Sequence, residues 1–541
     1  MKTNSRTTSL ALLALICVCA VGLRLAGVGW LADAVPHPGY SFHPDVMRFV
    51  EPIADFENIR SWRGYPVGFT SQLFVTATVL GYAGLDADPV TLIRSISLSY
   101  GVLTIFLVGL LAWRLSGSGG FGALAAAFLA LAPLHIINSH FGTPDGAATF
   151  FLYVTLIFGW RAVKHDRDLD FVLFVASVGV SLAMKFYFPL LVPLAVVTWM
   201  QPRRMERLLL AAFVLAGSFS IASFFNYTPW ELKELVRMLL HDNLDTEDGF
   251  GPLQQLGLYA WDSIRALGIG AWLCFLVGAA DAMVRAWRAW VGSGSSISER
   301  VVGFVNSPYI VPASAFAVYL AAVLAADIHA PRHLLPFLPL MCFLAASGVT
   351  IIYKRIAPRR TLGAGILLLL FAYQSYNALG IEAQYRRDIR NVLANEIDKL
   401  PVPPEEVATF SEYSLVRGTR LTSPLEDARS EPESAYFVTC DLEYARYFSA
   451  DTAGKVFHAR GGQTRLDFYR KLFAQQLDYR VAFEIHRQAR TLEERLAASG
   501  FLSHIGEFLV NHCALFQRSS SSAHAAPIRN RAMRRAMREW S

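Results

Sequence analysis

The chain has 541 residues, of which 54% are hydrophobic and 17% are charged, and its formal net charge is +6. Soluble proteins carry about 25% charged residues, so this composition excludes an ordinary soluble fold and favours a protein embedded in lipid. The positive charge does not indicate a nucleic-acid partner, because the basic residues gather in short loops between apolar segments.

Apolar segments recur along the first 380 or so residues, and most are long enough to cross a hydrocarbon layer of ~30 Å. They predict a polytopic α-helical membrane protein with about eleven spans. The predicted spans are 10–32, 94–113, 121–138, 146–163, 171–187, 189–200, 208–225, 264–284, 308–326, 333–353 and 361–380. The first is interpreted as an uncleaved span, because its apolar run continues well past the small residues of a possible signal-peptide cleavage site.

The loops between these segments alternate in character. One set is basic, and the other set is richer in acidic and aromatic residues. The second set comprises 33–93, His140–Asp145, Asn226–Asp262 and Asp327–His333. Placing the basic set in the cytoplasm orients every span consistently, with 33–93 as a large first outer loop of the membrane domain 1–381.

The segment 171–200 is too short for two full passes, which need roughly 40 residues. The turn at Lys185–Pro189 is therefore predicted to lie below the outer surface, where irregular backbone is tolerated only inside protein or beside a watery cavity. Lys185 is expected to face such a cavity. The alternative is a lysine whose ammonium extends to the lipid headgroups.

Residues 382–518 predict a small extracytoplasmic α/β domain, and 519–541 a flexible basic tail. An amphipathic helix is expected from residue 383 onwards, followed by strands at 407–410, 435–440 and 508–516 and helices at 464–477 and 490–499. Cys440 and Cys513 fall in predicted strands. They could pair in an oxidising compartment, but the sequence does not say which strands are neighbours, so the disulfide stays open.

Three outer loops carry residues suited to chemistry. The first holds His43, Asp45, Glu51 and Asp55, the second holds Asp145, and the third holds His329, Arg332 and His333. Carboxylates suit a general base or a cation site, and a guanidinium suits phosphate. Each residue alone has a plain explanation as a solvated acid or an interface anchor, but their joint placement favours one site.

The order of several motifs resembles the GT-C class of glycosyltransferases that use polyprenyl-phosphate sugars, which includes protein O-mannosyltransferases and lipid A aminoarabinose transferases. The resemblance covers roughly residues 10–390. The motifs are HPD at 43–45, Tyr65-Pro66, Arg94 at the start of a span, WRLSG at 113–117, PLHIINSHFGTPD at 133–145, SLAMKFYFPLL at 181–191 and APRHLLPFLPLMCFLAASG at 330–348.

The resemblance implies roles for these residues. Asp45 would be the catalytic base, and Asp145 a second acidic residue of the catalytic site that supports the acceptor, a sugar hydroxyl or a metal. Lys185 and Arg332 would hold the donor phosphate. The remaining expected substrate-binding residues are His333, Arg94, Tyr65 and Glu51.

Metal dependence stays open. Many relatives carry an acidic pair at the first-loop position, whereas Val46 follows Asp45 here, and Glu51 or Asp55 could substitute. No cofactor is certain. A divalent metal is possible, with His43, Asp45 and His329 as candidate ligands, and the alternative for the histidines is local hydrogen bonding at the interface.

The resemblance thus implies a glycosyltransferase that moves a sugar from a polyprenyl-phosphate donor to a lipid, glycan or protein acceptor by inverting displacement. The chain would lie in the bacterial inner (plasma) membrane, in contact with membrane lipids, with its C-terminal domain extracytoplasmic. One alternative is a transporter or flippase for lipid-linked sugars, although no internal repeat is seen. Another is a non-catalytic scaffold.

Overall fold

The structure is a computed structural model of residues 1–541, and it describes most but not all of them. The described residues are 2–30, 32, 34–36, 41, 44–54, 67–85, 87–185, 188–200, 204–227, 231, 233, 237, 251–292, 296–325, 329–356, 360–403, 406–410, 414–421, 434–441, 462–487, 491–492, 495 and 512–519.

The chain forms two compact units. One comprises Met1–Val28, Arg48–Glu382 and Thr491–Ile505, and the other comprises Gly29–Met47, Ala383–Arg490 and Gly506–Ser541.

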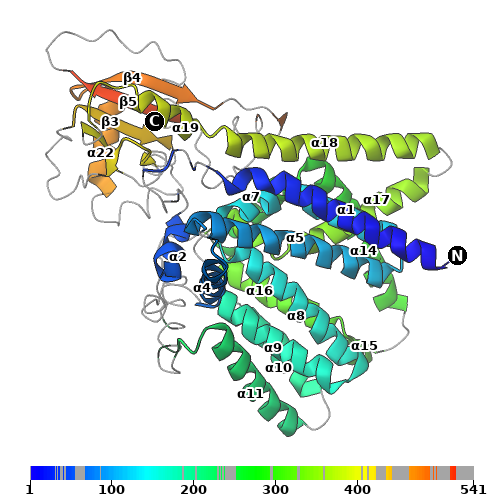
Figure 1. The fold of residues 1–541 in the computed structure, drawn as a ribbon. Coiled ribbons are helices and arrows are strands. Elements are labelled where there is room, and N and C mark those ends of the chain that lie inside the picture. Colours follow the sequence, from blue (N-terminus) through cyan, green and yellow to red (C-terminus); the bar gives the residue numbers. More distant parts are fainter. Residues whose placement is uncertain are drawn as a thin grey trace. The chain divides into compact units, whose positions relative to one another are not determined.

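The chain up to residue 386 consists mainly of helices (Figure 1). In chain order they are α1 (Lys2–Val28), α2 (Pro44–Ala54), α4 (Val67–Tyr82), α5 (Pro89–Ser116), α6 (Gly119–Leu131), α7 (Pro133–Phe141), α8 (Asp145–His165), α9 (Asp168–Met184), the 3-10 turn η1 (Phe188–Leu190), α10 (Leu191–Met200), α11 (Arg204–Ala222), α13 (Pro252–Leu267), α14 (Ile269–Gly292), α15 (Ile297–Val305), α16 (Ile310–Ala325), the 3-10 turn η2 (Pro331–Leu334), α17 (Leu338–Ile356) and α18 (Arg360–Arg386).

The helices confirm an integral membrane protein. Seven helices of the described residues are long and apolar enough to cross a membrane, or eight if the bent pair α6 and α7 counts as one. Shorter apolar helices lie at Phe188–Met200 and Ile310–Ala325. Each predicted span coincides with one of these helices or with α9, so the predicted positions hold while the number of full crossings stays approximate.

Close helix packing depends on small residues. A Cβ atom added at Gly278 of α14 would lie 1.9 Å from the carbonyl oxygen of Leu344, and one added at Gly348 of α17 would lie 1.9 Å from that of Cys274. The two backbones therefore touch, as small residues allow in membrane helices. Helices α8, α9 and α11 also run side by side (Figure 1).

The break between α6 and α7 is a 59° bend next to Pro133, which has no N–H group to continue the helix. Arg24 of α1 binds there, and its side chain is fully buried. Its Nη2 donates to the carbonyl oxygen of Ala130 at 3.0 Å and lies 2.9 Å from His135 Nδ1. A buried guanidinium requires such partners, so this contact fixes α1 against the bend.

Two predicted loops contain helices that the sequence did not indicate clearly. The first outer loop holds α2 and α4, and the Asn226–Asp262 loop holds most of α13. Helix α4 packs against α5, α9 and α11, and its first half is buried, so it belongs to the helical core although it lies within the predicted first outer loop.

The second unit contains a five-stranded sheet of order β2-β1-β3-β5-β4. Its strands are β1 (Val407–Thr409), β2 (Arg420–Leu421), β3 (Tyr436–Cys440), β4 (Tyr479–His486) and β5 (His512–Arg518). Strand β1 is parallel to β2 and β3, whereas β5 is antiparallel to β3 and β4. Helix α22 (Gly462–Phe473) covers one face through Leu466 and Tyr469.

The predicted elements of this unit are confirmed in part. Strands β1 and β3 and helix α22 lie where the sequence predicts them, and β5 begins at His512. The predicted amphipathic helix is divided, because Asp388 starts a new helix, α19 (Ile389–Ile397), by accepting from the N–H of Arg390. Most of the predicted helix 490–499 and residues 508–511 lie outside the described residues.

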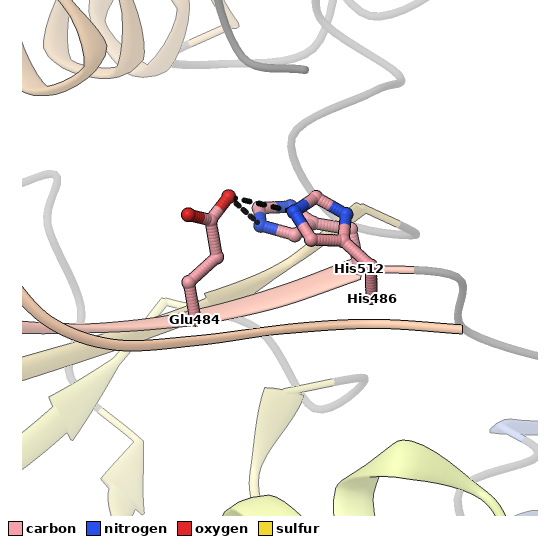
Figure 2. Close-up of side chains that lie close together, drawn as sticks. All are labelled: Glu484, His486 and His512. Carbon is pink, nitrogen blue, oxygen red and sulfur yellow. Dashed lines mark hydrogen bonds and ion pairs between the residues drawn. The ribbon is translucent and has the colours of Figure 1, made fainter. Parts of the chain in front are cut away.

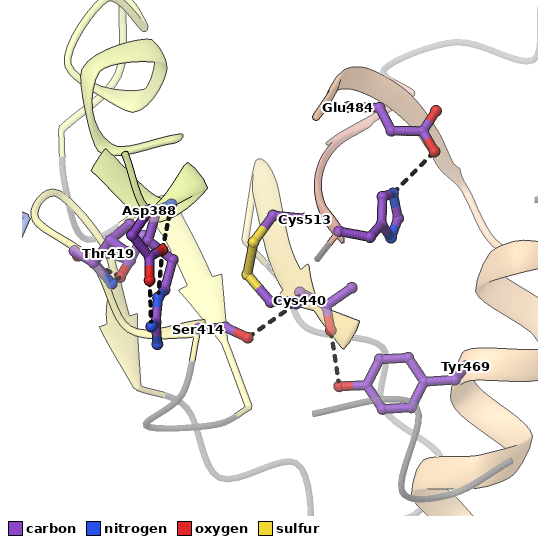
Figure 3. Close-up of a disulfide and its surroundings, with 11 residues drawn as sticks. Asp388, Ser414, Thr419, Cys440, Tyr469, Glu484 and Cys513 are labelled. Atoms are coloured by element: carbon purple, nitrogen blue, oxygen red, sulfur yellow. Dashed lines mark hydrogen bonds and ion pairs between the residues drawn. A yellow bond between two sulfur atoms is a disulfide. The ribbon is translucent and has the colours of Figure 1, made fainter. Parts of the chain in front are cut away.

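Cys440 and Cys513 form a disulfide, which answers the question that the sequence left open. They lie directly opposite each other on β3 and β5 (Figure 3). The N–H of Cys440 also donates to Ser414 Oγ at 3.0 Å. A disulfide favours an oxidising compartment for this unit.

Candidate functional site

Asp145 and Lys185 meet although 40 residues separate them. Asp145 is the first residue of α8, and Lys185 immediately follows α9. Lys185 Nζ donates a hydrogen bond to Asp145 Oδ1. The Asp145 side chain is 9% exposed and that of Lys185 is 30% exposed, so the pair lies at the edge of the packed helices with the ammonium partly open.

The turn before α8 holds Asp145 in place. Gly142 has a φ of 73°, and an added Cβ would lie 2.8 Å from Ile93 Cγ2 and 3.3 Å from Arg94 Cγ. Glycine is therefore required both for the left-handed backbone and for the close approach to α5. Ser97 of α5 donates to the carbonyl oxygen of Thr143 at 3.4 Å. Helix α5 thus supports the residues that lead into Asp145.

The end of α9 is supported by α4. A Cβ atom at Gly68 would lie 2.6 Å from the carbonyl oxygen of Ala183, two residues before Lys185. The following helix, α10, has ten residues and is ~15 Å long, about half the thickness of the hydrocarbon layer. The short helix agrees with the predicted turn at Lys185, and the depth of that turn stays a prediction.

Arg332 supplies a second cation. It lies in η2, and its charge and that of Lys185 both act on Asp145. Two cations from distant parts of the sequence thus lie near one carboxylate. Such a group can fix an anionic oxygen of a ligand, because fixed positive charges outside bulk water interact strongly with a negative one.

His333 is held by two tyrosines. Its Nδ1 lies 2.8 Å from the hydroxyl of Tyr259 in α13, and its carbonyl oxygen accepts from the hydroxyl of Tyr319 in α16 at 3.2 Å. Burial, together with the charges of Lys185 and Arg332, lowers the pKa of His333. The imidazole is therefore neutral near pH 7 and acts here as a hydrogen-bonding group rather than as a cation.

Tyr153 connects α8 with the segment that follows η2. Its hydroxyl donates to the carbonyl oxygen of Pro336 at 3.0 Å and accepts from the N–H of Leu340 at 3.1 Å. Pro336 precedes α17, where the chain would otherwise leave backbone groups unpaired. The contact fixes η2 relative to the helix that carries Asp145.

His329 contacts α13. Its Nε2 lies 2.7 Å from Asp262 Oδ2, and its Nδ1 lies 3.4 Å from Gln255 Oε1. Asp262 is buried. Among the described residues, no group of three metal-ligating side chains gathers around His329, so its role as a candidate metal ligand stays a prediction.

The other predicted site residues divide into two kinds. Arg94 is buried in α5, and its Nη1 donates to the carbonyl oxygen of Val28 at 3.1 Å. Asp45 and Glu51 both lie in α2, but their side chains are outside the described part of the structure, as are His43 and Tyr65 entirely. The roles expected for these four residues stay predictions.

The sequence did not indicate Tyr259, Asp262, Tyr319 or Tyr153. All four act through hydrogen bonds to η2 or its neighbours. A tyrosine in an apolar helix gives no separate signal in a sequence, because its ring is as well suited to packing as to bonding.

No protein-family model matches the chain, and no curated protein matches its sequence. Solved structures that match it include two of ArnT from Cupriavidus metallidurans. For ArnT bound to undecaprenyl phosphate, the identity is 14% and the TM-score 0.43, covering 74% of this chain and 72% of that one. For apo ArnT, the identity is 15% and the TM-score 0.43, covering 97% and 100%. A likeness this low leaves the function to be argued from the chain's own residues.

Proposed function

We propose that the chain is a membrane glycosyltransferase. It takes a sugar from a polyprenyl-phosphate donor and passes it to an acceptor hydroxyl on the extracytoplasmic side of the membrane. The acceptor belongs to a lipid, a glycan or a protein. The motif order from His43 to Gly348 and the set of apolar helices both support this function.

The observation that carries the proposal is the convergence of Lys185 and Arg332 on Asp145. Neither cation is placed like an ordinary surface charge, because both lie beside apolar helices and next to the half-buried His333. A charged group in such a place is costly unless it has a function or a partner. A lipid-linked phosphate would provide that function, since its chain lies in the membrane and its anionic oxygens lie at the membrane edge.

The reaction is a single displacement at the anomeric carbon. The acceptor oxygen forms a bond to that carbon, and the bond from the carbon to the phosphate oxygen breaks. The polyprenyl phosphate leaves with the bonding electron pair, and the acceptor proton passes to a carboxylate base, which we assign to Asp45. Lys185 and Arg332 stabilise the negative charge that grows on the leaving phosphate.

Asp145 then has a positioning role. A carboxylate bonded to an ammonium and close to a guanidinium is a poor proton acceptor. Its hydrogen bond with Lys185 instead orients the ammonium before the donor arrives. When the donor phosphate binds, it competes with Asp145 for Lys185, so part of the ammonium's interaction moves to the phosphate.

The test compares the lipids and glycans of cells that lack the protein with those of cells that carry it. Wild type should restore one glycoform by mass spectrometry, and Asp45→Asn and Lys185→Gln should not, although both insert in the membrane. The matched control is Arg285→Gln, which breaks a solvent-exposed ion pair with Asp281 in α14. Identical profiles with and without the protein would refute the function. Movement of a lipid-linked sugar without a change in its bonding would favour a transporter.

A further inference from the structure

A second group of polar side chains lies on the sheet of the C-terminal unit, outside the candidate glycosyltransferase site. It comprises Glu484 and His486 of β4 and His512 of β5 (Figure 2). Glu484 Oε1 lies 2.9 Å from Nε2 of His486 and 2.9 Å from Nε2 of His512. One carboxylate oxygen thus faces two imidazole nitrogens at once.

The pairing of the strands explains this arrangement. His486 lies directly opposite His512, and Glu484 lies directly opposite Ala514. Residues two apart on a strand share a face, so all three polar side chains point to the same side of the sheet. The small side chain of Ala514 leaves room for Glu484 to extend towards His512.

A bulge in β4 determines which residues face this side. The register shifts between Val481 and Phe483, so that Val481 lies opposite Phe516 whereas Phe483 lies opposite Leu515. If β4 paired without this register shift, Phe483 and Ile485 would share the face of Phe516, and Glu484 and His486 would point away. Bulges often redirect side chains in this manner at functional positions.

The two imidazoles are fixed beside each other. Their ring centroids are 4.4 Å apart, with an angle of 22° between the planes. On the opposite face of β5, Cys513 is bonded to Cys440 on β3, which holds the strand that carries His512 (Figure 3). The side chains of Glu484 and His512 are 13% and 11% exposed, and that of His486 is 45% exposed. The three side chains are therefore held in fixed positions, and His486 is open to solvent. Strand β4 is an edge strand of the sheet.

We propose that Glu484, His486 and His512 form a binding site for a divalent transition-metal ion of the Zn²⁺ type. The three ligand atoms lie within 4.8 Å of one another. Ligand atoms around a tetrahedral Zn²⁺ with bonds of about 2.0–2.1 Å lie roughly 3.3 Å apart, so a small adjustment of the side chains admits the ion. Two imidazoles and one carboxylate are a set that Zn²⁺ binds, with a fourth position for water.

The bound ion would stabilise the pairing between the end of the edge strand β4 and β5. In the metal-free protein the carboxylate of Glu484 connects β4 with β5 by hydrogen bonds alone. The ion replaces these bonds with three coordinate bonds across the same strands. Because binding then favours the folded unit, the metal should raise the melting temperature of the chain. This site is separate from the predicted metal candidates His43, Asp45 and His329.

The probe is Co²⁺, whose visible absorption reports tetrahedral coordination, with Zn²⁺ as competitor. The full chain in detergent is first freed of metal with a chelator. We compare wild type with His486→Ala and His512→Ala. Wild type should bind one more Co²⁺ ion per chain than either variant, or its affinity for Co²⁺ should be at least about 100-fold higher. The matched control His165→Ala removes an exposed histidine from α8 and should bind Co²⁺ as wild type does.

His486 is the decisive position, because it is half-exposed and its replacement leaves the core of the sheet intact. Far-ultraviolet circular dichroism and the retained Cys440–Cys513 disulfide verify the fold of each variant. Zn²⁺ should raise the melting temperature of wild type but not that of folded His486→Ala. Equal Co²⁺ binding by the two proteins, or no Co²⁺ binding by wild type, would overturn the proposal.

Discussion

The ammonium of Lys185 bonds to the carboxylate of Asp145 across the gap between the end of α9 and the start of α8. The two residues belong to different turns of the chain, yet they form one ion pair beside Arg332 and His333. The ion pair offsets the cost of placing the Lys185 charge beside apolar helices. It also separates the roles of the acids, because Asp145 holds a cation while Asp45 is left as the proposed base.

The substitution Asp145→Asn should change binding and transfer in opposite directions. Loss of the carboxylate removes the competitor of the donor phosphate, so affinity for undecaprenyl phosphate should rise by roughly threefold or more. Transfer should fall at least about tenfold, because Lys185 loses its orientation. Lipid binding and product formation are measured on the same preparation. Equal losses in both quantities would contradict the positioning role.

Tyr259→Phe should destabilise the chain through His333. The substitution removes the 2.8 Å hydrogen bond to Nδ1 of the half-buried His333, which costs about 1 kcal/mol. Thermal unfolding in detergent measures the effect. The control is Tyr309→Phe, because Tyr309 is 64% exposed and its variant should unfold as wild type does. Indistinguishable melting of the Tyr259 and Tyr309 variants would show that the bond is not stabilising.

Gly142 and Gly117 offer a comparison at nearly the same backbone angle. Their φ values are 73° and 70°, but a Cβ at Gly142 would collide with Ile93 whereas one at Gly117 meets no atom within 4 Å. Alanine should therefore cost about 1 kcal/mol at Gly117 and at least about 1 kcal/mol more at Gly142. Thermal unfolding of both variants gives the difference. Only Gly142→Ala should also reduce sugar transfer, because Asp145 follows three residues later. A larger loss of stability in Gly117→Ala than in Gly142→Ala would contradict the predicted collision with Ile93.

The hydrogen bonds of Glu484 should make the stability of the metal-free chain depend on pH. Burial acts to raise the pKa of Glu484, but the bonds with His486 and His512 outweigh it, so the pKa lies below its ordinary value. A carboxyl group with a lowered pKa stabilises the folded state above its unfolded pKa of about 4.5, and this contribution is lost as the pH falls below that value.

Melting temperatures near pH 5 and near pH 3, both below the ordinary histidine pKa of about 6.5, with chelator present, measure this contribution. Wild type should lose more stability on acidification than Glu484→Gln, whose side chain has no carboxyl group to protonate. Glu396→Gln in α19 removes a carboxylate of a more exposed ion pair with Lys399 and serves as the control. Identical pH dependence of wild type and Glu484→Gln would contradict the assignment.

Much of the membrane fold could be predicted from the sequence, because lipid imposes a strong pattern on it. Charges are costly beside apolar helices, so Asp145, Lys185 and Arg332 stood out before their contacts were known. Tyr259 and Asp262 did not stand out, because α13 is amphipathic and lies in a segment that has the polar composition of a loop.

The sheet was harder to predict than the helices. Strand β4 was missed because its bulge interrupts the alternation that marks a strand. The group of Glu484, His486 and His512 depends on a pairing between strands, and no spacing along the chain encodes it. The disulfide was open for the same reason, since Cys440 and Cys513 are 73 residues apart and meet only through the order of the strands.

The most direct measurement compares the binding of undecaprenyl phosphate and undecaprenol, the same lipid without its phosphate, by native mass spectrometry. The account predicts that wild type and the control Arg285→Gln prefer the phosphate. It predicts that Lys185→Gln loses at least about tenfold in affinity for it, and that the double variant with Arg332→Gln loses about 100-fold or more. Equal binding of the two lipids by wild type, or an unchanged preference in the double variant, would contradict a phosphate site at Lys185 and Arg332.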